Sequence, residues 1–318
     1  MNDMEEKPLR IAVAGVGHLG QHHARLSHEL PFLQLAGIAD PDQERGEKIA
    51  GEYQVPWVAS VDELPDEVEA LAVVTPTIGH WETSRKALDR GWHVFVEKPI
   101  TRTVEEGQLL VDYTRQRGKV LQVGHIERFN SAVLEVVNHL REPRFIECHR
   151  LGPLAPRVKD IGVVKDLMIH DLDLVLSLVN SEVESVEAVG VAVLTLHEDI
   201  ANARVRFKNG CIANFTVSRV SPEQMRKIRF FQSDAYFSLD YQKHCLESYY
   251  KITPPSGGMP SIERKLHQME GGNALARELA AFARSVREGA LPAVSGEDGL
   301  KALELAEEIS RQIHNAWL

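Results

Sequence analysis

The glycine-rich segment 15–20, Gly-Val-Gly-His-Leu-Gly, constrains the fold of this chain more than any other stretch. The apolar run 9–14 precedes it and has the pattern of a buried parallel strand, and residues 19–29 follow it with the pattern of a helix. Glycines at this spacing between a strand and a helix are typical of a turn that holds a dinucleotide pyrophosphate at the positive end of the helix. The segment therefore predicts a dinucleotide site on a βα unit.

Each glycine has a distinct part in this prediction. Gly15 permits the tight turn, Gly17 leaves room for the pyrophosphate, and Gly20 lets the helix pack closely on the strand. Asp40 lies 20 residues after Gly20, where its carboxylate would accept hydrogen bonds from ribose hydroxyls and repel a 2′-phosphate, so the sequence favours NAD over NADP. Arg45 follows in the next predicted helix and could reach such a phosphate, although a solvated helix face suits it better.

The first 124 residues alternate between short apolar runs and helical patterns. Such alternation predicts a doubly wound parallel sheet with helices on both faces. We expect strands at 9–14, 33–39, 57–59, 71–74, 93–96 and 120–123, and helices at 19–29, 42–52, 80–90 and 103–117.

The pattern changes after Gly124. Two alternating runs around Asn209-Gly210 predict a hairpin, and similar runs nearby suit an open, mostly antiparallel sheet. We expect the hairpin strands at 203–207 and 212–217, further helices at 131–140, 273–288 and 299–315, and a loop at 253–260. The chain is therefore predicted to be an α/β protein of two domains. A Rossmann NAD-binding domain would cover 1–124, and a substrate-binding and oligomerisation domain with C-terminal helices would cover 125–318.

Composition excludes several classes of partner. A net charge of -10 over 318 residues argues against nucleic acid, whose phosphates select basic surfaces. The start of the chain is acidic, unlike a signal peptide, and no apolar run approaches the roughly 18 residues that span a bilayer. The three cysteines and 14 histidines show no metal-ligand spacing, so we predict reduced thiols, no metal site and a cytoplasmic location without membrane contact. The cysteines are Cys148, Cys211 and Cys245.

Lys98 ends the fifth predicted strand, at the edge of an open α/β sheet where ligands bind. Pro99 follows directly, and the bond between them is a candidate cis peptide, since X-Pro bonds are the only common cis peptides. A lysine in this position is a better candidate for function than an ordinary solvated lysine.

A second group of polar residues lies in the apolar segment 163–179. Asp166, His170, Asp173 and Ser177 fall on one stripe of a helix, and a polar stripe on a buried helix is costly unless its members are paired or functional. Alternatively, Asp166 caps the helix and His170 is a hydrogen-bonded core histidine. This segment alone leaves both interpretations open.

Taken together, these motifs resemble the glucose–fructose oxidoreductase / inositol dehydrogenase / MocA-type oxidoreductases over essentially the whole chain. The carriers of the resemblance are Gly15-x-Gly17-x-x-Gly20, Asp40-Pro41, Thr75-Pro76 with His80, Glu97-Lys98-Pro99-Ile100, and Asp166-x-x-x-His170-x-x-Asp173. The resemblance implies a Rossmann domain followed by an α/β domain whose sheet often forms the oligomer interface, and hence a homodimer or homotetramer.

The resemblance also implies roles for individual residues. Lys98, Asp166 and His170 would be catalytic at a hydride-transfer site where the two domains meet. His170 would take the hydroxyl proton, Lys98 would stabilise the alkoxide and Asp166 would orient them, although Lys98 and His170 could exchange roles. The cofactor would contact Gly15, Gly17, His18, Leu19, Gly20, Asp40, Thr75, Pro76, His80, Glu97 and Lys98.

Basic residues gather in the second predicted domain, which favours an anionic substrate such as a sugar nucleotide. The alternative is that many of them lie on a solvated or subunit-facing side of the sheet. Seven lie between positions 204 and 229 against one acid, Glu223, and three more precede them: Arg204, Arg206, Lys208, Arg219, Arg226, Lys227 and Arg229, then Arg150, Arg157 and Lys159.

Two short motifs, 124–130 and Ser218-Arg219-x-Ser221, are similar to the branch of the family that acts on UDP-N-acetylhexosamines as 3-dehydrogenases. This similarity implies substrate contacts from Glu127, Arg128, Asn130, Arg157, Asp173 and Arg219. A dehydrogenase of a free sugar or a polyol such as inositol is one alternative. A non-catalytic dinucleotide-binding regulator is another, against which the presence of all three reactive residues argues.

Overall fold

Six short strands form one parallel sheet in the computed structural model, which describes residues 7–154, 161–255, 258–269 and 271–317. The strand order is β3-β2-β1-β4-β5-β6, so the direction of winding reverses between β1 and β4. This is the predicted doubly wound sheet, in which ligands bind at the carboxyl ends of the strands near the reversal. The strands are β1 (Leu9–Ala14), β2 (Leu33–Ala39), β3 (Trp57–Val58), β4 (Ala70–Val73), β5 (His93–Glu97) and β6 (Leu121–Gly124).

Four helices connect these strands, and local capping sets several of their ends. The Asp42 carboxylate accepts from the Arg45 N–H at the start of α2, and the Thr103 hydroxyl accepts from the Glu106 N–H at the start of α4. Gly118, with φ +61°, ends α4 in the left-handed conformation. The helices are α1 (Gly20–Glu29), α2 (Gln43–Tyr53), α3 (His80–Asp89) and α4 (Val104–Arg117).

The chain forms two units, and helix α7 (Ala274–Glu288) belongs mainly to the first, which comprises residues 1–125 and 275–300. Leu279 and Phe282 of this helix are fully buried in the same core as Phe95 of β5, and the Phe95 and Phe282 ring centroids lie 5.8 Å apart. The sequence analysis assigned this helix to the second domain. Its amphipathic pattern predicts an apolar face but does not say which sheet that face covers.

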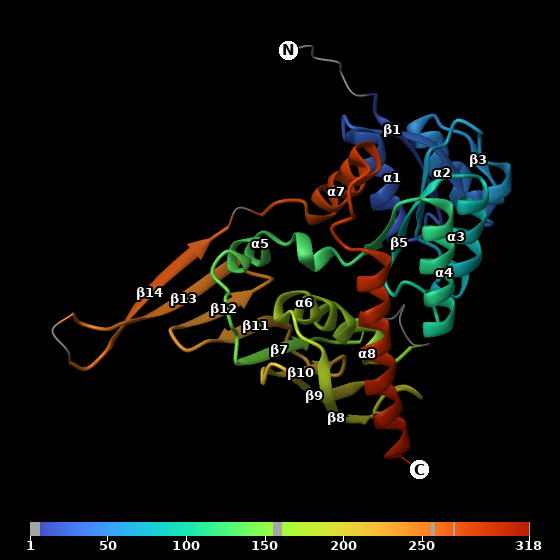
Figure 1. Cartoon of the computed structure of the whole chain (residues 1–318). Helices are drawn as coiled ribbons and strands as arrows, with labels where there is room; N and C mark the ends of the chain where they lie inside the picture. The colour runs from blue at the N-terminus through green and yellow to red at the C-terminus, as the bar shows by residue number, and fades with distance from the viewer. Residues whose placement is uncertain (1–6, 155–160, 256–257, 270, 318) are drawn as a thin grey trace, which may run out of the picture. The chain divides into compact units, whose positions relative to one another are not determined.

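The second unit, residues 126–274 and 301–318, contains an open sheet in the order β14-β13-β12-β11-β7-β10-β9-β8. The pairing is antiparallel except between β7 and β10, and the predicted hairpin is β9 and β10, with Gly210 at φ +84° in its turn. β13 and β14 form a long hairpin at one edge (Figure 1). The strands are β7 (Phe145–Leu151), β8 (Val183–Val191), β9 (Ile200–Phe207), β10 (Ile212–Ser218), β11 (Met225–Phe231), β12 (Ala235–Asp240), β13 (Cys245–Ile252) and β14 (Ser261–Gln268).

Helix α6 (Ile169–Val179) covers one face of this sheet, where Leu172 and Val175 share a core with Phe215 and Phe230 of the strands. The other helices that reach this unit are α5 (Ser131–Val137) and α8 (Gly296–Asn315). No helix within the described ranges has both the length and the apolar character that a membrane span requires.

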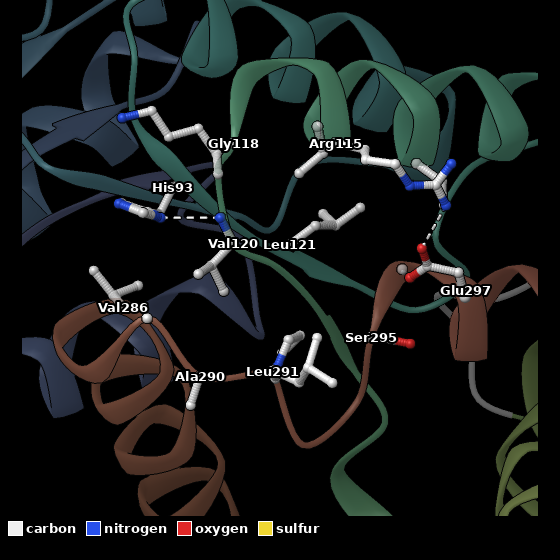
Figure 2. A pocket seen from close by; sticks show the side chains of 16 residues that line it. His93, Arg115, Gly118, Val120, Leu121, Val286, Ala290, Leu291, Ser295 and Glu297 are labelled. Carbon is white, nitrogen blue, oxygen red and sulfur yellow. Dashed lines mark hydrogen bonds and ion pairs between the residues drawn. The ribbon is translucent and has the colours of Figure 1, made fainter.

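A cavity of about 360 Å³ in the first unit lies beside the starts of β5 and β6. His93 lines it, and its Nδ1 accepts a hydrogen bond of 3.0 Å from the Val120 N–H (Figure 2). Burial, aided by the charge of Lys119, lowers the pKa of His93 to about 4. His93 is therefore neutral in the folded protein at neutral pH.

This shift predicts a pH-dependent loss of stability. The unfolded chain binds a proton at His93 near pH 6.5, whereas the folded chain does so only near pH 4, so falling pH between these values favours unfolding, by about 3 kcal/mol at most. His93→Asn keeps an acceptor for Val120 but cannot titrate. Urea unfolding at pH 7 and pH 4.5 should show a smaller loss of stability in the variant than in the wild type; equal losses would contradict the prediction.

Candidate functional site

The glycine turn after β1 has the geometry that a dinucleotide site needs. Gly15 has φ +85°, and a Cβ there would lie 2.7 Å from the Val74 carbonyl oxygen. A Cβ on Gly20 would lie 1.8 Å from the Gly15 carbonyl oxygen, so the helix can approach the strand only with glycine at that position. A Cβ on Gly17 would meet nothing within 4 Å. Gly17 thus borders open space at the start of α1, and the side chains of His18 and Leu19 are exposed next to it.

Asp40 lies where the sequence predicted it, at the end of β2, but its carboxylate is already well supplied with donors. Oδ2 accepts from the Val16 N–H at 2.8 Å and from Arg45 Nε at 3.1 Å, and Oδ1 accepts from the Asp42 N–H at 2.9 Å and from Arg45 Nη2 at 2.7 Å. Burial alone would raise the pKa of Asp40, but these hydrogen bonds outweigh it and hold the pKa below its ordinary value. Arg45 lies on a partly exposed helix face, as expected, and it is also the ion-pair partner of Asp40, which the sequence did not predict.

His80 joins the ends of two neighbouring strands. Its ring is 1% exposed, with Nδ1 2.9 Å from the Pro99 carbonyl oxygen and Nε2 2.9 Å from the Thr75 carbonyl oxygen. Burial lowers the pKa of His80 despite these two acceptors. The Lys98–Pro99 bond is cis, so the cis candidate is confirmed. The hydroxyl of Thr75 is buried without a hydrogen-bond partner among the described residues, which is compatible with a ligand that binds there.

Glu97 and Lys98 follow one another at the carboxyl end of β5. Glu97 Oε1 lies 2.8 Å from Nε2 of His23, which is buried on α1, and Oε2 accepts from the backbone N–H of Lys98 at 3.3 Å. His23 was not among the site residues predicted from sequence. Its only signal was helical spacing, since His23 comes three residues after Gly20, on the side of α1 that also carries the buried Ala24 and Ser27.

In the second unit, Asp166 lies inside a π-helical turn (Val164–Met168), and α6 begins only at Ile169. The Asp166 N–H donates to the Gly162 carbonyl at 3.1 Å. The alternative of Asp166 as the cap at the helix start is therefore wrong, because it lies within a wider helical turn that the regular 3.6-residue period does not describe. His170 is the second residue of α6 and is half-buried.

Three predicted substrate residues belong to a set of ion pairs on α6. Arg128 donates to both carboxylate oxygens of Asp173, at 2.7 Å from Nε and 2.5 Å from Nη2. Arg150 donates to both oxygens of Asp171, at 3.0 and 2.9 Å, and to Glu127 at 2.9 Å. These pairs fasten the turn that follows β6 to the helix that contains His170. The sequence analysis did not predict them, because the partners are 21 to 45 residues apart.

Asn130 and Arg219 also have hydrogen-bond partners in the second unit. The Asn130 side chain accepts from the Ala132 N–H at 3.0 Å and caps α5. Arg219 is buried and donates to Asp199 at 2.6 Å, to Thr195 at 2.7 Å and to the Ile161 carbonyl at 2.7 Å. Arg157, the sixth predicted substrate residue, lies outside the described residues, as does Lys159.

Many of the basic residues of the second unit form ion pairs with acidic side chains. Besides the pairs above, three ion pairs join neighbouring strands or turns: Lys208 with Glu182, Lys227 with Asp240, and Arg229 with Glu147. Counting basic residues therefore overstates the positive charge available to an anionic substrate. Within the described ranges, no group of three His, Cys, Asp or Glu side chains is arranged to hold a metal ion.

Comparison with known proteins places this geometry in context. An oxidoreductase family description with an NAD-binding Rossmann fold matches residues 9–125, and the description of the C-terminal alpha/beta domain of the same family matches residues 140–316. A UDP-N-acetylglucosamine 3-dehydrogenase of Acidithiobacillus ferrooxidans is 38% identical, covering 87% of this chain and 88% of that protein. A scyllo-inositol 2-dehydrogenase (NAD(+)) of Bacillus subtilis is 26% identical, covering 98% and 95%.

The solved structures lead to the same family. A structure of UDP-N-acetylglucosamine 3-dehydrogenase from Acidithiobacillus ferrooxidans matches with a TM-score of 0.91 and 36% identity, covering 96% of this chain and 98% of that one. Both halves of the chain therefore agree with the resemblance drawn from sequence. The chain belongs to the glucose–fructose oxidoreductase / inositol dehydrogenase / MocA family of NAD-binding oxidoreductases.

Proposed function

We propose that this protein is an NAD-dependent dehydrogenase that oxidises the 3-hydroxyl of a UDP-N-acetylhexosamine. The observation that supports this substrate most is the 38% identity, over 87% of the chain, to a UDP-N-acetylglucosamine 3-dehydrogenase. The open space at Gly17 and the buried hydroxyl of Thr75 suit a dinucleotide bound along the carboxyl edge of the parallel sheet. We assign residues 1–124 to cofactor binding and 125–318 to substrate binding, except for helix α7, which packs in the core of the first unit. We place the activity in the cytoplasm, consistent with three free, buried cysteines.

The reaction is a hydride transfer, for which NAD, when bound, supplies the acceptor. In our proposal His170 takes the proton from the sugar hydroxyl, because an imidazole titrates near working pH. Lys98 stabilises the alkoxide that develops as the proton leaves. Asp166 orients these groups. The opposite assignment, with Lys98 moving the proton, remains the alternative.

The six predicted substrate residues divide by their surroundings. In the proposal, Glu127, Arg128 and Asp173 act on the substrate as an ordered set, held by Arg150 and by one another. Asn130, Arg157 and Arg219 remain proposed contacts. Many of the basic residues pair with acidic side chains of the same chain, which favours a second candidate substrate, a free polyol, because a polyol needs no cationic subsite. The inositol dehydrogenase among the relatives fits that candidate.

A substrate screen tests the proposal. UDP-N-acetylglucosamine and UDP-N-acetylgalactosamine should reduce NAD and give a 3-keto product by NMR, while myo-inositol, scyllo-inositol and glucose should not. Lys98→Met should lower kcat about 10³-fold, since it removes the charge that stabilises the alkoxide, and should leave NAD binding nearly intact by calorimetry. Turnover of polyols without any turnover of UDP-sugars would select the second candidate, and full activity of Lys98→Met would refute the role of Lys98.

The cofactor preference follows from the Asp40–Arg45 pair, and we propose NAD over NADP. The Asp40 carboxylate must accept from ribose hydroxyls, and Arg45 competes for the same oxygens. Arg45→Ala should therefore raise the ratio of kcat/KM for NAD to kcat/KM for NADP. Asp40→Ala should lower the same ratio, because it removes the repelling charge and releases Arg45 toward a 2′-phosphate. Steady-state kinetics with both cofactors measure it; a ratio that falls in Arg45→Ala would contradict this reading.

We also propose that the protein is a homodimer or homotetramer through the open face of the eight-stranded sheet. An aromatic row crosses that face, with ring centroids 5.5, 4.7 and 5.1 Å apart along Phe145, Phe231, Tyr236 and Tyr249. Tyr236→Glu should shift the mass measured by light scattering toward the monomer, because a charge would be buried in the interface. Leu291→Glu, at a position that is 91% exposed in the first unit, is the matched control and should not. A wild-type monomer would refute this part of the proposal.

A further inference from the structure

We propose that His23 is a positioning residue, which holds the Glu97 carboxylate at the end of β5 so that a fixed negative charge lies beside Lys98. This inference rests on the proposed catalytic role of Lys98. Nothing in the comparisons concerns His23.

The geometry begins with the hydrogen bond between His23 and Glu97. Nε2 of His23 lies 2.8 Å from Oε1 of Glu97, and the two side chains are 1% and 14% exposed. A carboxylate only accepts, so Nε2 carries the proton. The other nitrogen, Nδ1, is buried without a hydrogen-bond partner among the described residues. An N–H on Nε2 thus faces Oε1, and the buried ring holds that oxygen in place.

The second oxygen of Glu97 is fixed as well. Oε2 accepts from the backbone N–H of Lys98 at 3.3 Å. On the neighbouring strand, a Cβ on Gly124 would lie 3.0 Å from Oε2, so glycine there leaves the carboxylate the room that it occupies. The carboxylate is therefore held between α1, the start of the Lys98-Pro99 segment and β6. Only His23 supplies the side-chain hydrogen bond among these contacts.

The charge balance favours an ionised Glu97. Burial raises the pKa of Glu97, but the hydrogen bond from His23 and the nearby positive charge, that of Lys98 included, outweigh it, so the pKa lies below its ordinary value. An ionised carboxylate next to an ammonium favours the charged form of the ammonium. Lys98 must be charged to stabilise an alkoxide, so the His23–Glu97 pair supports the state of Lys98 that the reaction needs.

Without His23, the carboxylate loses its anchor and either turns away from Lys98 or takes up a proton. His23→Leu should therefore move the alkaline limb of the kcat/KM pH profile to lower pH by about one unit, a tenfold loss at a fixed alkaline pH. Glu97→Gln, which keeps the shape but removes the charge, should move it in the same direction. His23→Gln, which retains an N–H donor, should restore much of the wild-type profile. His28→Leu, at an exposed position on the same helix, is the matched control and should leave the profile unchanged.

A second measurement does not depend on turnover. The carboxyl carbon of Glu97 can be followed by NMR in ¹³C-labelled protein and assigned with Glu97→Gln; it should titrate at higher pH in His23→Leu than in the wild type. If His23→Leu does not fold, the comparison of Glu97→Gln with His23→Gln decides: a shifted alkaline limb in the first and not in the second supports the inference. An unchanged limb in Glu97→Gln, or an unchanged titration of Glu97 in His23→Leu, overturns it. Absence of UDP-sugar turnover by the wild type would reject the proposed substrate and leave the NMR test valid.

Discussion

The close contacts of the two nitrogens of the buried His80 ring with the carbonyl oxygens of Thr75 and Pro99 are the constraint on which the carboxyl edge of the first unit depends. They join the segment after β4 to the segment after β5, and Lys98 lies in the second of these. On the other side, the carboxylate of Glu97 is tied to α1 through His23. The backbone around Lys98 is thus held from two helices, so a long, flexible side chain starts from a well-defined position. Catalytic groups need such support, because small errors in position cost large factors in rate.

The regular parts of this fold could be predicted because their signals are local. Short apolar runs predict the six parallel strands, and Asn209-Gly210 between two alternating runs predicts the β9–β10 hairpin. The glycine turn could be predicted residue by residue. At Gly15 and Gly20 a Cβ atom would clash with neighbouring backbone atoms, so only glycine fits at these two positions. The motif around Lys98 was recognised for a similar reason, because strand, charge and proline follow one another directly.

The remainder depends on partners that are distant in sequence. Arg150 was counted as available positive charge, yet in the fold it joins Asp171 and Glu127, and Arg219 joins Asp199 in the same way. Only the tertiary structure shows which acid neutralises which base. The π-helical turn at Asp166 is a further case: a single extra residue per turn leaves the composition unchanged but alters which side chains share a stripe.

Helix α7 has a consequence for how this protein is made. Its residues Leu279, Phe282 and Ala283 complete the core beneath Phe95, although the other buried residues of that core are encoded before residue 126. When only the first 125 residues have been synthesised, one apolar surface of the parallel sheet is still uncovered. Helix α7, which covers that surface, is synthesised only after residues 126–274. The order of synthesis therefore exposes the nucleotide-binding half to premature association, and a fragment that ends at residue 125 would keep that exposure permanently.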